Sequence, residues 1–277
     1  MNETLRLLLK HKGGLIGLCI VLGSVITALL SNFITPYNPY DADLNRALQS
    51  PSIKYPLGTD EQGRDILSRI IYGSRFSLFI AFTSVAIGAL IGIPIGLISG
   101  YYGGWMDYIV QRITDILLAL PGIVLALALV AILGPGLMNL IIAIGIGFIP
   151  TYIRLTRGVT LQVKSMEYIV AAKMLGLSNF RIIFRHILPN ILPPLTVQLT
   201  LHIGSAILGA AGLGFLGLGV QPPHPEWGAM IGTGRSYIFR APHLVLFPGL
   251  ALFLVVLGFN LLGSALQEIL DPRLRRG

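Results

Sequence analysis

The sequence alternates between long apolar stretches and short segments that hold nearly all of its charge. Five stretches contain no Lys, Arg, Asp or Glu, and they cover residues 13–40, 76–106, 116–153, 187–225 and 241–267. Each is longer than the roughly 20 residues with which a helix crosses a bilayer. The third is too long for one crossing and contains Gly134-Pro135-Gly136, a strong turn signal. We therefore expect about six membrane-spanning helices, near residues 13–34, 76–100, 113–133, 137–156, 191–218 and 244–266.

The composition supports an all-α, polytopic membrane protein. Hydrophobic residues make up 54% of the 277 and charged residues 12%, against about 25% charged in an average soluble domain. The net charge of +8 comes from basic residues that flank apolar spans, which is typical of membrane orientation and not of a nucleic-acid-binding surface. Because Cys19 is the one cysteine, an internal disulfide and a multi-cysteine metal site are both excluded.

The basic residues also predict the orientation, because Lys and Arg near span ends are retained in the cytoplasm. With the N-terminus inside, 13 of the 20 Lys and Arg residues fall on the cytoplasmic side and seven on the external side. Lys10 and Lys12 precede the first apolar stretch and also permit a signal-peptide interpretation. The apolar run of about 22 residues and the lack of a small-x-small cleavage site favour an uncleaved anchor. We expect a multi-pass protein with both termini in the cytoplasm.

This topology divides the chain into four parts. Residues 1–34 form the cytoplasmic N-terminus and first span, 35–75 an external loop, 76–268 a five-span core and 269–277 a cytoplasmic tail. The external loop is too short for an independent domain. In its second half, the apolar residues 66, 67, 70 and 71 recur at helical spacing between charged ones. This pattern predicts a short amphipathic helix over residues 60–75, lying at the outer surface.

The longest cytoplasmic loop, residues 157–190, has a pattern of its own within the core. Its first part is rich in helix formers, and Gly176 is placed as a helix stop. Ser178 or Asn179 can cap a second helix, which Pro189 is predicted to end. The expected shape is a helix, a glycine turn and a second helix. Such a protruding bend can fit a groove on another protein.

This loop resembles the cytoplasmic signature of the permease subunits of ATP-driven (ABC) importers. The family pattern is Glu-Ala-Ala, three residues, Gly, nine residues and Ile-x-Leu-Pro. The chain supplies five of these positions at the family's spacing, namely Ala171, Ala172, Gly176, Leu188 and Pro189. It departs from the pattern at Val170, which replaces the glutamate, and at His186, which replaces the isoleucine. The charged anchor is therefore either lost or supplied by Glu167, one helical turn earlier.

Three further segments resemble the dipeptide, oligopeptide and nickel branch of that family. Residues 57–69 with 73–78 match the external motif of the branch's second permease. Residues 215–223 with 226–230, which include Gln221-Pro222-Pro223 and Glu226-Trp227, match the exit of the fifth span. The ending, residues 271–274, fits as well. Together with the cytoplasmic loop, these segments extend the resemblance over nearly the whole chain.

The resemblance implies a type I importer permease fold in the cell (inner or plasma) membrane, and a transport subunit that is not an enzyme. The implied partners are a second homologous permease, two cytoplasmic ATPases that use ATP and Mg²⁺, an external substrate-binding protein and membrane lipid. The chain itself lacks a GxxxxGK[ST] P-loop, and we expect it to bind no cofactor, metal or nucleic acid. Segments 58–75 and 222–240 are expected to contact the binding protein. The implied ATPase-coupling residues are Glu167, Ala171, Ala172, Gly176, Leu177, Leu188 and Pro189.

Uncharged polar residues within the spans are candidates for lining the translocation path, although a structural role is equally consistent with each. They are Ser84, Thr200, His202, Ser205 and Asn260. An intramembrane histidine is a functional candidate by default, and an interhelical hydrogen bond is the alternative for His202. The spans lack the intramembrane carboxylates that an ion-coupled carrier needs, which disfavours a stand-alone carrier. The pattern Gly212-x-Gly214-x-x-Gly217 favours close helix packing over dinucleotide binding, because no βαβ unit surrounds it.

The substrate is not determined by these patterns. Dipeptides or oligopeptides are the expected cargo for this branch, and nickel or a metal chelate is the alternative. The resemblance implies that selection lies largely in the external binding protein, so the permease sequence leaves both open.

Overall fold

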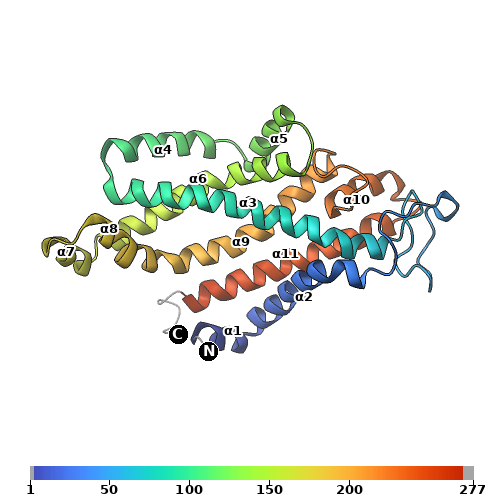
Figure 1. Cartoon of the computed structure of the whole chain (residues 1–277), viewed down its shortest axis with the longest axis horizontal. Helices are drawn as coiled ribbons and strands as arrows, with labels where there is room; N and C mark the ends of the chain where they lie inside the picture. Colours follow the sequence, from blue (N-terminus) through green and yellow to red (C-terminus); the bar gives the residue numbers. More distant parts are fainter. Residues whose placement is uncertain (1–2, 271–277) are drawn as a thin grey trace.

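The chain folds into a bundle of long helices that lie side by side along one axis (Figure 1). The computed structural model describes residues 3–270, so the expected match at 271–274 and most of the tail 269–277 lie outside the described residues. The α-helices are α1 (Glu3–Lys10), α2 (Lys12–Ile34), α3 (Ile66–Tyr102), α4 (Gly104–Leu118), α5 (Gly122–Leu133), α6 (Leu137–Lys164), α7 (Glu167–Met174), α8 (Asn179–Ile182), α9 (Leu188–Phe215), α10 (Trp227–Gly234) and α11 (His243–Leu270).

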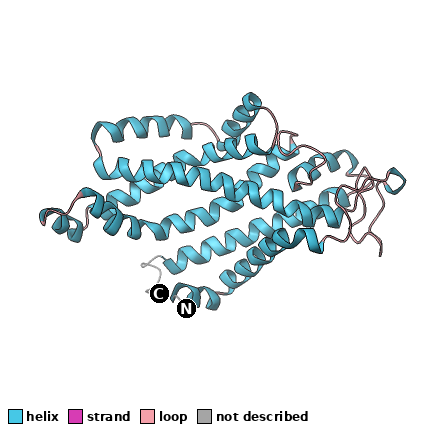
Figure 2. Cartoon of the chain, viewed as in Figure 1, coloured by secondary structure: helices cyan, strands magenta, loops and turns pink. Residues whose placement is uncertain are grey.

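The two ends of the bundle differ in what they carry. Figure 2 shows helix throughout the long axis, with the longest loop, residues 35–65, gathered at one end together with α10. The bend formed by α7 and α8 protrudes at the opposite end, and the chain's first helix and the end of α11 lie towards that side (Figure 1). The all-α expectation is confirmed for the described residues.

Five helices are long and apolar enough to cross a membrane: α2, α3, α6, α11 and a continuous helix over Asn179–Phe215. The predicted span 113–133 was wrong as a straight helix, because α4 and α5 meet at a bend of 87°. The break falls at Ala119-Leu120-Pro121. Proline has no N–H to continue a helix and disfavours helical backbone at the residue before it. Residues 3–270 thus contain five candidate membrane spans, or six if the bent pair is counted as one.

The predicted surface helix over residues 60–75 was also wrong. Residues 66–75 are instead the first turns of α3, which begins at Ile66 and continues to Tyr102. The Asp65 carboxylate caps this start by accepting hydrogen bonds from the Ser68 N–H at 2.8 Å and the Ser68 hydroxyl at 2.6 Å. Ile66 and Ser68 are fully buried. The amphipathic spacing therefore reflects burial under the 35–65 loop and not a helix lying on the membrane.

Pro189 does not end a helix, contrary to the sequence-based prediction. The helix passes from α8 through a π-helical turn, Ile183–Ile187, into α9 without a break. The Leu188 N–H bonds to the Ile183 carbonyl, five residues earlier. The Asn190 side chain donates to the His186 carbonyl at 2.6 Å. This wider turn and the side-chain donor accommodate the backbone around the proline, as happens in membrane helices.

A close seam of the bundle joins α3 to α6 through glycines spaced four residues apart. A Cβ added at Gly92 would lie 2.6 Å from the Tyr152 Cβ, and one added at Gly96 would lie 2.5 Å from the Ile153 carbonyl oxygen. The same face of α3 carries Gly88 and Gly100. Helices in lipid associate largely through such close backbone packing. This seam holds α6, which leads directly into α7, against α3.

We predict that Gly96→Leu disrupts this seam and lowers the yield of folded chain several-fold. The larger side chain forces α3 away from α6, and overpacking of this kind costs about 1–3 kcal/mol or more. Size-exclusion chromatography of a fluorescent fusion in mild detergent measures the folded fraction. Gly23→Leu in α2 is the matched control, since a Cβ there has no neighbour within 4 Å. Equal yields from the two variants would contradict the packing role.

Candidate functional site

The α7–α8 bend is built on a buried anchor with an exposed outer side. In α7, Ile169 and Ala172 are buried, whereas Val170 and Ala171 are exposed, so the two alanines of the motif face different ways. Ile169 belongs to an apolar cluster that includes residues of α3, α6 and the π turn. Glu167 is exposed in the first turn of α7, where the helix dipole favours a carboxylate.

The turn at Gly176 has the hydrogen bonds of a Schellman motif. The Gly176 N–H bonds to the Lys173 carbonyl at 3.0 Å, and the Leu177 N–H bonds to the Ala172 carbonyl at 3.2 Å. Gly176 has a φ of +77°, a left-handed conformation that side chains with a Cβ rarely adopt. No atom lies within 4 Å of where its Cβ would be. Backbone conformation, and not lack of space, therefore requires glycine here.

Ser178 then caps the second helix, because its hydroxyl accepts a hydrogen bond from the Arg181 N–H at 3.4 Å. This confirms one of the two predicted caps. Leu177 and Leu188 are half-buried against the same apolar cluster as Ile169. Pro189 is exposed. Of the expected coupling residues, Ala172, Gly176, Leu177 and Leu188 thus fix the bend. Glu167, Ala171 and Pro189 lie exposed on its surface.

The tip of the bend is apolar and exposed. Met174, Leu175 and Phe180 are 83%, 80% and 70% exposed, and the rings of Phe180 and Phe184 lie 4.5 Å apart. A groove of about 540 Å³ is lined by Ser178, Phe180, Arg181, Phe184, Arg185 and Pro189. An exposed apolar patch rimmed by charge marks a protein-interaction surface. The aromatic pair was not predicted from the sequence, although its four-residue spacing is visible there.

The bend is tied to the membrane helices by polar contacts with α3. The Tyr101 hydroxyl donates to the Asn179 side-chain oxygen at 2.7 Å. Lys164, the last residue of α6, hydrogen-bonds to the Tyr101 carbonyl, and its ammonium lies 5.6 Å from the Tyr101 ring centroid. These contacts join α3, α6 and α8.

An ion pair that the sequence did not reveal links α4 to α6 on the same side. The Arg157 guanidinium donates to both Asp107 carboxylate oxygens, at 2.6 and 2.7 Å. Ser99 of α3 also hydrogen-bonds to Asp107. The pair joins residues 50 apart in sequence, so only the fold brings them together. A second pair, Arg154 with Asp115, lies further along the same two helices.

The structure does not gather the five path candidates on one face. Ser84 is fully buried and donates to the Ile141 carbonyl of α6 at 3.1 Å, which is a structural contact. Thr200 and Ser205 bond to carbonyls of their own helix, α9, and five residues place them about 140° apart around it. Asn260 is exposed on α11. A shared path-lining role for these residues stays a prediction.

His202 is buried between α9 and α6. Its ring stacks on Phe148 at 4.7 Å and meets the edge of Tyr152 at 5.0 Å. Its Nε2 lies 2.6 Å from the Gln198 amide nitrogen, one turn earlier in α9. The polar contact of His202 is therefore made within one helix, whereas its contacts with the neighbouring helix are aromatic. Within residues 3–270, no group of three or more His, Cys, Asp or Glu side chains is arranged to hold a metal ion.

At the opposite end, two segments distant in sequence meet. The Trp227 indole N–H donates to the Ile70 carbonyl at 3.1 Å. The buried Glu226 carboxylate accepts hydrogen bonds from the N–H groups of Gly228 and Ala229, at 2.9 and 2.8 Å, and from Ser77 at 3.3 Å. Burial raises the pKa of Glu226, and the two N–H donors oppose that shift. The 222–240 segment is thereby fixed to the start of α3.

The 35–65 loop is held over this end by a buried charge cluster. Asp60 pairs with Arg64 at 2.6 Å and lies 3.2 Å from the Arg69 Nε, and all three residues are 5% exposed or less. Arg69 in turn donates to the Pro39 carbonyl at 2.9 Å. The segments expected to face a binding protein therefore form one rigid surface of the bundle.

The helical bundle has the fold of an ABC transporter permease. A chain of the MetNI methionine ABC transporter, solved in inward-facing conformations, shares this fold with a TM-score of 0.60 at 21% identity, over 73% of this chain and 96% of that one. A second crystal form of the same transporter gives a TM-score of 0.60 at 20% identity, over 74% and 97%.

The chain belongs to the family of binding-protein-dependent transport system inner membrane components, which it matches over residues 92–276. Residues 1–51 match the N-terminal transmembrane domain of oligopeptide transport permease C. It is thus a multi-pass permease subunit, and not itself an enzyme, of the dipeptide and oligopeptide ABC permease family. Membership of a binding-protein-dependent system implies an ATPase and a binding protein as partners.

Similar proteins include several peptide permeases. A dipeptide transport system permease protein of Alkalihalophilus pseudofirmus is 47% identical, over 99% of this chain and 90% of that protein. A glutathione transport system permease protein of Pectobacterium atrosepticum is 46% identical, over 98% and 90%. A di/tripeptide transport system permease protein of Pseudomonas aeruginosa is 46% identical, over 96% and 89%.

Proposed function

We propose that this chain is one of two permease subunits of an ABC importer for peptides of two or three residues. The observation that carries the proposal is the 46–47% identity to dipeptide, di/tripeptide and glutathione permeases over nearly the full chain. A second homologous permease completes the pore, two cytoplasmic ATPases power it and an external binding protein delivers the peptide. Glutathione is itself a tripeptide, so import of glutathione is the second candidate.

The exposed tip of α7 and α8 is the proposed docking element for an ATPase. Its apolar side chains and the Phe180–Phe184 pair offer a surface that a cleft on a partner can enclose. The buried side of the bend is fixed to α3 and α6. Closure of the ATPases would therefore move these helices, and with them the path. The proposal includes Glu167 as the residue that supplies the charged anchor in place of the glutamate absent at Val170.

Co-purification followed by uptake assays tests the proposed function. The tagged chain, expressed with its native neighbours and solubilised in mild detergent, should bring down a homologous permease and P-loop ATPases, identified by mass spectrometry. Vesicles containing the complex should then accumulate a labelled dipeptide only with ATP and the binding protein. Unlabelled tripeptide, glutathione and Ni²⁺ serve as competitors. A chain that purifies alone and moves solute without ATP would refute the assignment as an ABC importer subunit. Competition by Ni²⁺ alone would replace the peptide with nickel as the assigned substrate.

We also propose that the α7–α8 tip and both termini are cytoplasmic and that the 35–65 loop is external. In a Cys19→Ala background, a single cysteine at Leu175 or at Ile53 reports the two sides, because these side chains are 80% and 104% exposed. A membrane-impermeant maleimide should label the cysteine at position 53 in intact cells and the one at position 175 only after the cells are opened. The reverse pattern would invert the topology.

A further inference from the structure

A cavity of about 440 Å³ opens between α2 and α3 at the end of the bundle that carries the 35–65 loop. Its described lining residues are Val25, Ala28, Leu29, Tyr72, Arg75, Phe76, Leu78, Phe79, Phe82 and Leu137. The volume lies within the roughly 300–1,000 Å³ of pockets that bind small molecules. Leu29 and Phe79 are 73% and 50% exposed, so the cavity opens to the flank of the bundle.

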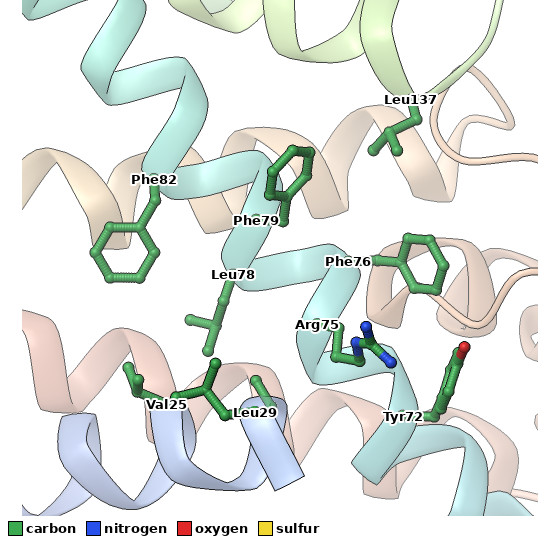
Figure 3. A pocket seen from close by; sticks show the side chains of 10 residues that line it. Val25, Leu29, Tyr72, Arg75, Phe76, Leu78, Phe79, Phe82 and Leu137 are labelled. Carbon is green, nitrogen blue, oxygen red and sulfur yellow. The ribbon is translucent and has the colours of Figure 1, made fainter. Parts of the chain in front are cut away.

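The cavity has a polar end and an apolar end. Figure 3 shows the Arg75 guanidinium and the Tyr72 hydroxyl at one end and Phe82 at the other, with Val25 and Leu29 of α2 facing Leu78. Arg75 is the one charged residue among the ten that line it. Its guanidinium donates to the Asn32 side-chain oxygen at 2.7 Å and lies 5.3 Å from the Tyr72 ring centroid.

Arg75 has the chemistry of a phosphate ligand. A guanidinium carries five N–H donors in a planar fork, which suits bidentate binding of a phosphate. Asn32 accepts from one of these donors, and the structure gives the others no hydrogen-bond partner among residues 3–270. Tyrosine and arginine are also typical residues of the membrane–water interface. The polar end therefore lies where lipid headgroups are found.

The length of the cavity is close to the thickness of the hydrocarbon layer of one membrane leaflet. Along α3, Tyr72 and Phe82 are ten residues apart, which corresponds to about 15 Å at 1.5 Å per residue. The hydrocarbon core of a bilayer is about 30 Å thick. A chain that enters beside Arg75 and reaches Phe82 would therefore run from the headgroup region to the middle of the membrane.

From this geometry we propose that the cavity is a binding site for one glycerophospholipid of the leaflet on the side of the 35–65 loop. An acyl chain occupies the apolar end between α2 and α3, and the phosphate binds the free donors of Arg75. The positive charge of Arg75 favours a phospholipid over an uncharged helix of the second permease, because such a helix would bury the guanidinium without an anionic group beside it. Lipid would then act as a spacer that fixes α2 against the core.

Photolabelling of the assembled complex tests this site. The wild-type chain, with its partner subunits, is reconstituted in vesicles that contain a phospholipid with a diazirine in one acyl chain, and labelled peptides are mapped by mass spectrometry. We expect labels within residues 25–29 and 72–82. Leu29→Trp should reduce them several-fold, because the indole fills the cavity. Leu30→Trp is the matched control, since the adjacent Leu30 is 45% exposed but does not line the cavity.

The phosphate contact is tested separately with Arg75→Gln, which retains a donor for Asn32 but no charge. Labelling by the phospholipid should fall several-fold in this variant, whereas labelling by an uncharged diacylglycerol probe should not change. Equal labelling of the Leu29→Trp and Leu30→Trp variants would overturn the proposal. Cross-links from this cavity to the second permease, obtained in place of lipid labels, would overturn it as well and would assign the groove to a subunit interface.

Discussion

Replacing Gly176 with valine is expected to lower ATP-dependent peptide uptake by about tenfold or more while the chain remains in the membrane. Gly176 has a φ of +77°, and left-handed backbone costs an L-residue about 1–2 kcal/mol, more when it is β-branched. About 1.4 kcal/mol corresponds to a factor of ten in a population. Valine would therefore shift the turn to another conformation and change the angle between α7 and α8. Under the coupling proposal, ATP hydrolysis continues but no longer drives uptake.

Gly176→Asn tests whether the backbone conformation of residue 176, or the space around it, is what requires glycine. Asparagine tolerates left-handed backbone, and no atom lies within 4 Å of the position of a Cβ. We expect near wild-type uptake from this variant. Parallel assays of uptake and ATP hydrolysis in vesicles measure both effects. Unchanged uptake in Gly176→Val would contradict the coupling assignment. An equal loss of uptake in both variants would show that the partner ATPase needs the empty space beside residue 176.

Asp60→Ala is expected to unfold the 35–65 loop and abolish most uptake. The substitution leaves Arg69 buried without a carboxylate and leaves Arg64 paired with Glu61 alone, at 3.0 Å. The loss of one partner of a buried ion pair costs about 3–5 kcal/mol. The Asp60 carboxylate also accepts hydrogen bonds from the backbone N–H groups of Gln62 and Arg64, both at 2.9 Å. External protease added to intact cells should cut the variant loop rapidly and leave the wild-type loop intact.

Asp41→Ala is the matched control, because Asp41 lies in the same loop but pairs with Arg46 at 3.6 Å and its side chain is 64% exposed. Exposed pairs contribute about 0–1 kcal/mol, so this variant should resist protease and retain uptake. A protease-resistant Asp60→Ala loop would show that the buried charge cluster does not hold the 35–65 loop in place.

Local sequence signals predicted those elements whose cause is itself local. Apolar stretches long enough to cross a bilayer located the spans, and the glycine and serine at 176 and 178 located the bend and its cap. Prediction failed where the outcome depended on distant residues. The start of α3 is buried by the loop before it, and the π turn before Pro189 forms within an apolar cluster drawn from α3, α6 and α9.

The sequence by itself determined that this chain is an all-α membrane protein with a helix–glycine–helix bend, because hydrophobicity, length and the special backbone of glycine act within each segment. The tertiary structure alone decided which polar groups share a site. It placed His202 on the rings of Phe148 and Tyr152, joined Asp107 to Arg157, and left Arg75 at the mouth of an apolar cavity. These contacts cross between helices, and no periodicity along one segment specifies the neighbour that a face will meet.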